Sequence, residues 1–322
     1  MLLCALYVVL FAGHYDYYIL DQVSFPIPIL RCRSRNVFFY CHYPDKLLST
    51  DRSSFLKRFY RFFLDLIEEL TTAMAKTIVV NSLFTQNVFL NSFPLLRRIK
   101  GAHYKPEVVY PSIDEKSFNK TPGFSTTIEQ LLNRRVTADT VILTSLNRYE
   151  RKKNIPLALE AFAYYVTKSK AAGQPLLVIA GGYDERLEEN VSVHRELNER
   201  AADLGISDNI VFLRSISNDQ RILLLEHTKV LLYTPENEHF GIVPVEAMYM
   251  GCIALACNSG GPLESVADGQ TGFLMPPNSE VWGKKITEIL NGPKDQLTRM
   301  QKNAKSRVIA MFTFGAFAKQ LD

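Results

Sequence analysis

The sequence has few of the residues that mark small or specialised proteins. It has 322 residues and only 5 cysteines, an odd number with no CxxC pair, so neither a disulfide framework nor a zinc site is indicated. Gly and Pro number 16 and 15, which excludes collagen-like and low-complexity chains. The formal net charge of +4 is too small for a dedicated nucleic-acid binder, so no nucleic-acid partner is expected. With 47% hydrophobic residues, the chain has the composition of an ordinary globular protein.

The sequence also lacks an apolar run long enough to cross a bilayer, which takes about 20 residues. The run MLLCALYVVLFAG at residues 1–13 is shorter, and it has neither a basic start nor a small-residue cleavage site. It continues into YDYYILDQVS, whose alternating aromatic and apolar residues predict a buried strand. We therefore interpret the start of the chain as an internal helix and strand, and a true N-terminal anchor is the alternative.

Short β-branched or apolar runs alternate with helical patterns, as in βα units around a parallel sheet. In the first half, strands are predicted at residues 17–20, 37–42, 77–81 and 107–110, with helices at 55–75 and 85–93. A second series of strands is predicted at 141–146, 176–180, 210–213, 230–233, 253–256 and 272–274. The fold class is therefore α/β, with Rossmann-like parallel-sheet domains at residues 1–115 and 139–310, a linker at 116–138 and a tail at 311–322.

Positive charge is concentrated in the first domain, since residues 1–111 carry 13 Lys or Arg against 8 Asp or Glu, and residues 112–322 carry 24 against 25. The predicted helix SSFLKRFYRFFLDLIEEL has one broad apolar face, formed by Phe55, Phe59, Phe62, Phe63, Leu66, Ile67 and Leu70. Three cations lie near it: Lys57, Arg58 and Arg61. Two interpretations are open. The helix packs into the core with a solvated basic side, or it lies at a membrane surface and attracts anionic lipid or a lipid pyrophosphate.

The segment EHFGIVPVEAM has the pattern of a phosphate site. A strand is predicted to end before it and a helix to begin around Ile242, so amides at the helix start would point outward, where orphan N–H groups and the helix dipole favour anions. These amides belong to Gly241, Ile242 and Val243. Glu238 and Glu246 flank the site, and because carboxylates repel phosphate they suit sugar hydroxyls instead. A capping Glu and a surface Glu are the alternative.

Four cations follow the first strand of the second domain, in TSLNRYERKKNIPLALEAF: Arg148, Arg151, Lys152 and Lys153. The strand is predicted to end at residue 146 and a helix to begin near residue 154, which places these cations at the carboxyl edge of the sheet, where open α/β sheets bind ligands. Arg148 can bridge phosphate oxygens in a fork and Lys153 can add a point charge, which suits a diphosphate leaving group. A solvated basic turn is the alternative, above all for Arg151 and Lys152.

Together, Arg148-x4-Lys153 and Glu238-x7-Glu246 resemble the pattern of the retaining GT-B glycosyltransferases, in which two Rossmann-like domains face each other across a cleft. The resemblance extends to VVNSLFT, VVYPSID and NSGGPLES, and therefore covers most of the chain. A narrower resemblance, to the mannosyltransferases that extend the dolichol-linked precursor of asparagine-linked glycans, is carried by DQVS, FYCHYPD, NRYERKKN, AGGYDER and YTPENEHFGIVPVEAMYM.

This resemblance implies an enzyme at the cytosolic face of the endoplasmic reticulum membrane. It would transfer mannose from GDP-mannose, with retention, to Man-GlcNAc2-diphosphate-dolichol, making an α-1,3 and then an α-1,6 linkage. By the resemblance, Arg148 and Lys153 hold the donor diphosphate and neutralise charge as GDP leaves. Glu238 contacts mannose hydroxyls and Glu246 contacts the ribose. The remaining donor-side positions that it implies are Phe240, Gly241, Ile242, Val243, Gly181 and Gly182.

Further candidates lie in the first domain. His42, in FYCHYPD, resembles the histidine that the family has near the sugar and the acceptor, and a structural histidine is the alternative. Ser82, in NSLFT, is a candidate for a donor or acceptor phosphate. Lys57, Arg58 and Arg61 are candidates on the acceptor side.

No DxD-type metal motif is present, and the resemblance implies that cations and a helix N-terminus handle the diphosphate. We therefore expect no required metal or other cofactor. The expected partners are GDP-mannose, the dolichol-diphosphate oligosaccharide, the membrane surface and other mannosyltransferases of the same pathway.

The sequence departs from the family pattern at both ends. The family opens with a βα unit that carries a glycine-rich loop, and no GGxE-like segment precedes Asp21, so the first domain is expected to be N-terminally truncated. The chain also ends soon after FTFGAF, where these enzymes commonly have a final helix crossing back onto the first domain. Two other functions stay open: a shortened isoform with little activity that binds GDP-sugar or partner transferases, and another GT-B glycosyltransferase with a different acceptor.

Overall fold

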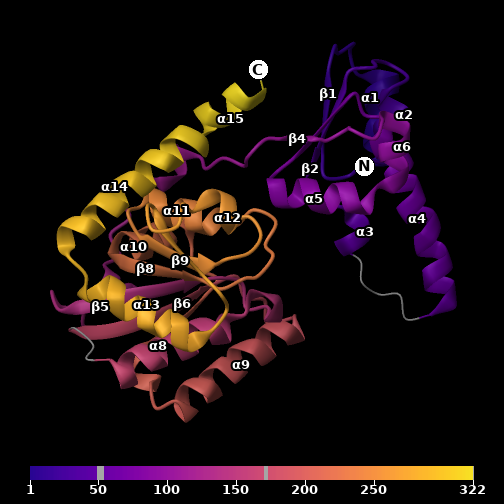
Figure 1. Cartoon of the computed structure of the whole chain (residues 1–322). Coiled ribbons are helices and arrows are strands. Elements are labelled where there is room, and N and C mark those ends of the chain that lie inside the picture. Colours follow the sequence, from indigo (N-terminus) through magenta and orange to yellow (C-terminus); the bar gives the residue numbers. More distant parts are fainter. Residues whose placement is uncertain (49–53, 170–172, 322) are drawn as a thin grey trace. The chain divides into compact units, whose positions relative to one another are not determined.

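The computed structural model describes residues 1–48, 54–169 and 173–321, and it divides into two compact units, Met1–Pro111 and Ser112–Asp322 (Figure 1). Each unit has its own parallel sheet and its own hydrophobic core. None of the described helices is both long and apolar enough to cross a membrane.

The first unit is built on a four-stranded parallel sheet whose strand order follows the sequence. Its strands are β1 (Tyr18–Asp21), β2 (Val37–Cys41), β3 (Thr77–Val80) and β4 (Glu107–Val108). Its helices are α1 (Leu2–Phe11), α2 (Ile27–Leu30), α3 (Asp45–Leu48), α4 (Phe55–Ala73), α5 (Leu83–Ser92) and α6 (Pro94–Lys100). All strands predicted for this part are confirmed. The predicted strand at the start of the chain is at the sheet edge, and Ile19 there is 75% exposed, so only one face of β1 is buried.

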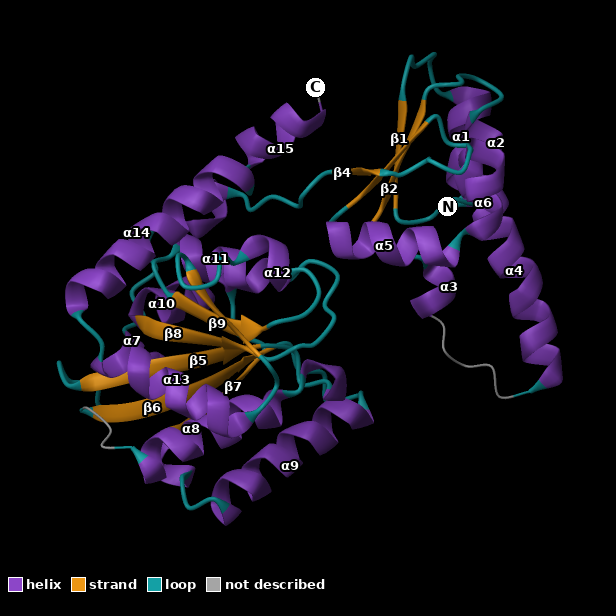
Figure 2. Cartoon of the chain, in the orientation of Figure 1, coloured by secondary structure: helices purple, strands orange, loops and turns teal. Residues whose placement is uncertain are grey.

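Helix α4 has its apolar face toward solvent along most of its length. Its buried residues are confined to the C-terminal part: Glu68, Glu69, Thr71 and Thr72. Its exposed large apolar residues are Phe55, Leu56, Phe59, Tyr60, Phe62, Phe63, Ile67 and Leu70. The interpretation of this helix as a core-packing element is therefore wrong. The N-terminal turns of α4 extend past the other helices of the unit, and no described helix or strand of the unit covers them (Figure 2).

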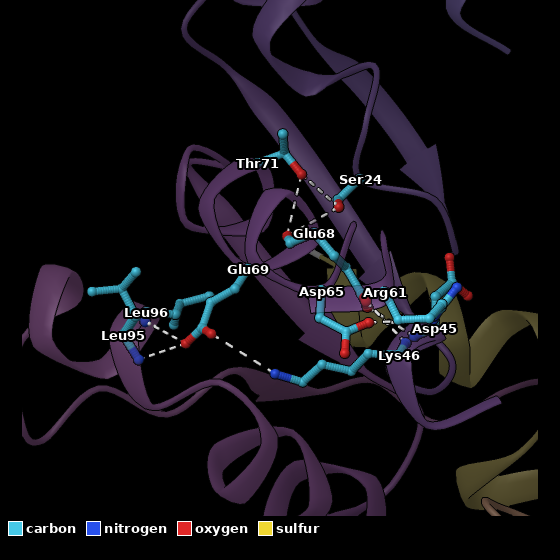
Figure 3. A network of polar contacts seen from close by, with 10 residues as sticks. All are labelled: Ser24, Asp45, Lys46, Arg61, Asp65, Glu68, Glu69, Thr71, Leu95 and Leu96. Atoms are coloured by element: carbon cyan, nitrogen blue, oxygen red, sulfur yellow. Dashed lines mark hydrogen bonds and ion pairs between the residues drawn. The ribbon is translucent and has the colours of Figure 1, made fainter. Parts of the chain in front are cut away.

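The buried part of α4 carries two adjacent carboxylates that cap other helices (Figure 3). Glu68 accepts hydrogen bonds from the backbone N–H groups of Asp45 at 2.8 Å and Lys46 at 2.9 Å, at the start of α3. Glu69 accepts two from the first turn of α6, from the N–H groups of Leu95 and Leu96. Burial raises the pKa of Glu68 to about 7, even though its hydrogen bonds act in the opposite direction. Glu68 therefore ties α4 to α3, and Glu69 ties it to α6.

The second unit is built on a six-stranded parallel sheet in the order β10-β9-β8-β5-β6-β7, which is the doubly wound order of dinucleotide-binding domains. Its strands are β5 (Thr140–Leu146), β6 (Gln174–Gly181), β7 (Ile210–Arg214), β8 (Thr228–Tyr233), β9 (Ile253–Cys257) and β10 (Gly272–Met275). All six predicted strands are confirmed. The parallel direction brings all their carboxyl ends to one edge of the sheet.

Helices cover both faces of this sheet (Figure 2). One apolar layer includes α8 (Ile155–Lys168), α9 (Glu188–Asp203) and α13 (Ser279–Asn291), with Trp282 fully buried. The other includes α7 (Ile128–Leu132), α10 (Asn218–His227) and α11 (Ile242–Tyr249). The remaining helices are α12 (Pro262–Ser265), α14 (Lys294–Met311) and α15 (Phe314–Leu321), with short 3-10 turns η1 (Glu115–Phe118), η2 (Arg151–Lys153) and η3 (Ser207–Asn209).

The segment that follows the first unit packs on the second. Phe118, at the end of η1, packs against Tyr249 of α11 with the rings tilted and their centroids 5.1 Å apart. Ile128 and Leu132 of α7 (Ile128–Leu132) are buried in the core of the second unit. Much of the stretch between the two sheets therefore belongs structurally to the second unit.

Candidate functional site

The order of the second sheet reverses between β5 and β8, which lie side by side and lead to helices on opposite faces. Ligands of open α/β sheets bind outside the carboxyl ends of strands at such a switch point. The two loops that start there are 147–154 after β5 and 234–241 after β8. These two loops contain the cations that follow β5 and the first carboxylate of the Glu238-x7-Glu246 motif, both of which were predicted from the sequence.

Lys153 and Glu238 meet at this switch point. The Nζ atom of Lys153 lies 2.6 Å from Oε2 of Glu238, and the side chains are only 15% and 25% exposed. The backbone of Lys153 is fixed by the loop that follows β8, because the hydroxyl of Thr234 donates a 2.7 Å hydrogen bond to the carbonyl oxygen of Lys153. Asn154 then turns the chain in the left-handed conformation, with φ 47°, into α8. The sequence-predicted cation and carboxylate are therefore in direct contact.

Arg148 lies in the same loop but is far more open, with a side chain that is 72% exposed and 3.7 Å from Glu150. Its aliphatic stem runs over Gly182, where an added Cβ would come within 3.4 Å of Cγ of Arg148. Gly181 lets the neighbouring loops meet, since a Cβ there would lie 2.0 Å from the carbonyl oxygen of Asn147. The structure thus gives Gly181 a packing reason, since it lets the loop that presents Arg148 approach β6, whereas a Cβ at Gly182 would make only an ordinary contact.

The other two cations of the loop contact neither Lys153 nor Glu238 in the ion pairs described for them. Arg151 forms a fork with Glu196 of α9, with distances of 2.8 Å and 2.7 Å. Lys152 lies 3.2 Å from Glu150 and is 72% exposed. These contacts agree with the alternative that Arg151 and Lys152 are surface charges.

Helix α11 begins where the sequence predicted, with Gly241 as its N-cap in the left-handed conformation at φ 77°. A Cβ at Gly241 would approach the ring of Tyr233 to 3.1 Å, so a glycine fits best there. Phe240 is buried and packs against Phe312, and its side chain is part of the core. Burial, reinforced by the charge of Glu238, raises the pKa of Tyr233 well above its ordinary value, so its hydroxyl stays neutral beside the helix start.

The NSGG segment supports the loop that carries Glu238. The N–H of Gly261 donates a 2.8 Å hydrogen bond to the carbonyl oxygen of Glu238. An added Cβ would lie 2.4 Å from that oxygen at Gly260 and 2.1 Å from the carbonyl oxygen of Phe240 at Gly261. Both glycines are therefore required by close backbone approach.

Glu246 lies one turn inside α11 and is paired with Arg221 of α10. The two side chains are 16% and 20% exposed. Sequence reasoning missed Arg221, because a lone arginine between polar residues and a short apolar run has the appearance of a surface charge. Only the packing of α10 beside α11 brings it to Glu246.

In the first unit, His42 follows β2 and its Nε2 lies 2.7 Å from Oδ1 of Asp21, at the end of the neighbouring β1. Gln22 fixes the same segment: its amide donates to the carbonyl oxygen of Tyr43, and its Oε1 accepts from the N–H of His42. Asp21 and Gln22 belong to the DQVS motif. This motif therefore orients His42 in the structure.

Ser82 is fully buried and caps α5, because its hydroxyl oxygen accepts the N–H of Thr85 at 2.9 Å. Lys57 and Arg58 are exposed on α4, and Arg61 lies 3.3 Å from Asp65 one turn further on. Within the described residues, no group of three or more His, Cys, Asp or Glu side chains is placed to hold a metal ion. The expectation that no metal is required stays a prediction.

Comparison with known proteins identifies the class of protein to which the chain belongs. The family model for glycosyl transferases group 1 matches residues 131–307. Sucrose-phosphate synthase from Thermosynechococcus elongatus superposes with a TM-score of 0.71 at 22% identity, over 95% of this chain and 72% of that one. The structure described as OtsA apo superposes with a TM-score of 0.79 at 11% identity, over 99% and 75%. The chain therefore has the GT-B fold, as predicted, and is a glycosyltransferase of group 1.

Its relatives define the family more narrowly. The chain is 44% identical over 326 residues to alpha-1,3/1,6-mannosyltransferase ALG2 of Homo sapiens, covering 100% of this chain and 76% of the human protein. It is 42% identical over 334 residues to alpha-1,3/1,6-mannosyltransferase ALG2 of Dictyostelium discoideum, covering 100% and 78%. The chain belongs to the family of ALG2 α-1,3/1,6-mannosyltransferases.

Proposed function

We propose that this chain transfers mannose from GDP-mannose, with retention, to Man-GlcNAc2-diphosphate-dolichol, adding the α-1,3-linked and then the α-1,6-linked mannose in the assembly of the N-glycan precursor. The observation that carries the proposal is the contact between Lys153 and Glu238 at the switch point of the second sheet. It is supported by the mannosyltransferase family to which the chain belongs.

In the donor site, positively charged groups bind the diphosphate and carboxylates bind the sugar and ribose hydroxyls. Lys153 and Arg148 hold the diphosphate and neutralise the charge that develops as GDP leaves, which is where electrostatic stabilisation acts on the barrier. The N–H groups at the start of α11, from Phe240 to Val243, complete the phosphate cradle. No divalent metal is needed in this scheme, because Lys, Arg and the helix N-terminus supply the positive charge.

Glu238 has a second task in the same scheme. Its carboxylate accepts hydrogen bonds from mannose hydroxyls, while Lys153 offsets its charge so that it does not repel the diphosphate. Retention then follows from displacement on one face of the sugar through an oxocarbenium-like state. Stabilisation of the leaving group, more than a strong protein base, lowers the barrier.

The first unit serves the acceptor. Helix α4 presents eight exposed large apolar side chains next to Lys57 and Arg58, the pattern of a helix that lies in a lipid interface. We propose that it rests on the cytosolic face of the endoplasmic reticulum membrane, where the lipid-linked acceptor is found, with Arg61 nearby. His42, oriented by Asp21, is assigned to the acceptor side, and sibling mannosyltransferases are proposed partners.

The test uses the full chain in liposomes with GDP-mannose and the Man-GlcNAc2 lipid. The proposal predicts two sequential transfers, with retained α linkages that an α-1,3- and an α-1,6-specific mannosidase distinguish. UDP-glucose, offered at the same concentration, should give no product. GDP binding in the micromolar range without any transfer would contradict the proposal and favour a protein with little activity that binds GDP-sugar or partner transferases. Transfer to a soluble acceptor alone would favour a different GT-B enzyme.

A further inference from the structure

Arg221 is held by several contacts close to the start of α11. Its Nη1 pairs with Oε2 of Glu246, and its Nη2 donates a 2.7 Å hydrogen bond to Oδ1 of Asn218. Its guanidinium also lies 5.5 Å from the ring centroid of Phe118. The amide of Asn218 in turn donates to the carbonyl oxygen of Ser117. The guanidinium is therefore held from three sides before any ligand binds.

The ion pair between Arg221 and Glu246 is expected to contribute little to the free energy of folding. Desolvating two charges costs about as much as their attraction returns, and buried ion pairs can often be replaced by apolar residues without loss of stability. What the pair does supply is orientation, because a guanidinium held by Asn218 and by the ring of Phe118 fixes the carboxylate oxygen that it contacts. The ion pair between α10 and α11 is thus better explained by the direction in which it holds Glu246.

The carboxylate of Glu246 keeps capacity for a ligand. A carboxylate has about four acceptor positions, and the contact with Arg221 uses Oε2. The remaining positions can accept from two neighbouring hydroxyls, such as those of a ribose. A carboxylate already fixed in one rotamer loses less conformational entropy when it binds.

We infer that Arg221 is a positioning residue that fixes the carboxylate of Glu246 for the ribose hydroxyls of the donor nucleotide. This inference rests on the proposed function, in which Glu246 contacts the ribose. Arg221 itself does not contact the nucleotide. The preference for a ribose depends on the ion pair of Arg221 and Glu246 and not on Glu246 alone.

The test compares the affinities of the full chain for GDP and for 2′,3′-dideoxy-GDP by calorimetry. The preference for GDP over the dideoxy nucleotide isolates the ribose hydroxyls, because base and diphosphate are the same in both. In the wild type we expect a preference of about tenfold or more, since hydrogen bonds to a charged group are among the stronger ones. Arg221→Ala should reduce this preference to less than half of the wild-type ratio, and Arg221→Lys should restore part of it.

Two further variants make the result decisive. Glu246→Gln should lose most of the preference, and Arg221→Ala added to it should change the ratio no further, because both act through one carboxylate. Arg200→Ala is the matched control: it also removes an arginine from an ion pair, that of Arg200 on α9 with Glu160 on α8 at 2.9 Å, and should leave the ratio unchanged. Thermal unfolding monitored at Trp282 checks that each variant is folded.

The outcomes separate the two claims. If the wild type has no preference for GDP, or if Glu246→Gln keeps it, the ribose role of Glu246 fails and the inference with it. If Glu246→Gln loses the preference but folded Arg221→Ala keeps it, only the role of Arg221 is refuted. An equal loss of affinity for both nucleotides would show a merely structural role and would also refute it. Should Arg221→Ala not fold, Arg221→Lys and Arg221→Gln decide by the same ratio.

Discussion

Lys153 and Glu238 are 85 positions apart in the sequence, yet their charged groups are 2.6 Å apart at the carboxyl edge of the second sheet. Each comes from the loop of a different strand, and these strands are neighbours only because the sheet order reverses between β5 and β8. The contact places a cation suited to a diphosphate beside a carboxylate suited to sugar hydroxyls. The two should therefore respond differently to substitution.

Glu238→Gln should separate chemistry from nucleotide binding. The amide keeps the size of the side chain and loses its charge, so we expect mannosyl transfer to fall by about 100-fold or more. The affinity for GDP should stay within about threefold of the wild type, or rise, because Lys153 is then free of its partner. Transfer rates in liposomes and calorimetry with GDP measure the two effects. Glu236→Gln, an exposed carboxylate in the same loop, is the control and should change neither.

Gly260→Ala should destabilise the second unit far more than Gly269→Ala. Both glycines have left-handed backbones, with φ 64° and 71°, so the backbone strain of a new Cβ is similar at the two positions. Only at Gly260 would that Cβ meet backbone, 2.4 Å from the carbonyl oxygen of Glu238, whereas nothing lies within 4 Å at Gly269. We expect a cost of about 1 kcal/mol at Gly269 and about 3 kcal/mol or more at Gly260. Urea unfolding followed by the single tryptophan, Trp282, reports this unit; equal costs would contradict the packing explanation.

The exposed face of α4 should bind lipid. Phe59 and Phe62 are 57% and 62% exposed, so changing both to Glu should leave the fold intact. Burial of one phenylalanine in an apolar phase is worth about 2 kcal/mol, and two added charges oppose binding further, so affinity for anionic vesicles should fall by about 100-fold or more. Leu187→Glu, a 53% exposed apolar residue at the start of α9, is the control. Vesicle co-sedimentation that is equal for both variants would argue against a membrane role for α4.

Glu68 should make the first unit less stable as pH rises. Burial raises its folded pKa from 4.5 to about 7, so between these values the folded protein keeps a proton that the unfolded chain has released. The stability that this proton confers is complete below about pH 4.5 and is lost as pH rises through 7, by at most about 3 kcal/mol. Glu68→Gln cannot titrate, so its stability should stay flat in comparison.

Hydrogen exchange of the segments around α3 and the buried part of α4, corrected for intrinsic rates, measures this effect at pH 5 and pH 8. The free energy of opening in the wild type should fall relative to Glu68→Gln over that range. The exposed carboxylate of Asp16 is the control, since Asp16→Asn should follow the wild type at both pH values. A difference between wild type and Glu68→Gln that does not depend on pH would overturn the assignment.

Periodicity in the sequence was sufficient to predict all ten described strands and the start of α11 at Ile242, because buried parallel strands are short apolar runs with clear ends. It could not decide which way α4 faces. An amphipathic helix has the same pattern whether its apolar face meets a core or a lipid surface, and only the packing of Glu68 and Glu69 into the unit shows that α4 is anchored by its polar C-terminal part.

The candidate site was predictable in part for a similar reason. Lys153 and Glu238 each follow a predicted strand, so the switch-point rule brings them to one edge. The pairing of Arg221 with Glu246 depends on how two helices pack side by side, and no local signal in either helix reports it. The need for Gly260 and Gly261 likewise arises from the approach of another loop, which the sequence alone does not contain.

The most direct test of the donor site compares Lys153→Ala with Lys152→Ala in transfer of mannose from GDP-mannose to the lipid-linked acceptor in liposomes. The two substitutions remove the same charge from adjacent positions, but Lys153 lies against Glu238 at the switch point and Lys152 is exposed beside Glu150. Lys153→Ala is predicted to lower the rate by about 100-fold or more, with weaker binding of GDP, and Lys152→Ala by no more than about threefold. Equal rates in the two folded variants would contradict the assignment of this switch point as the donor site.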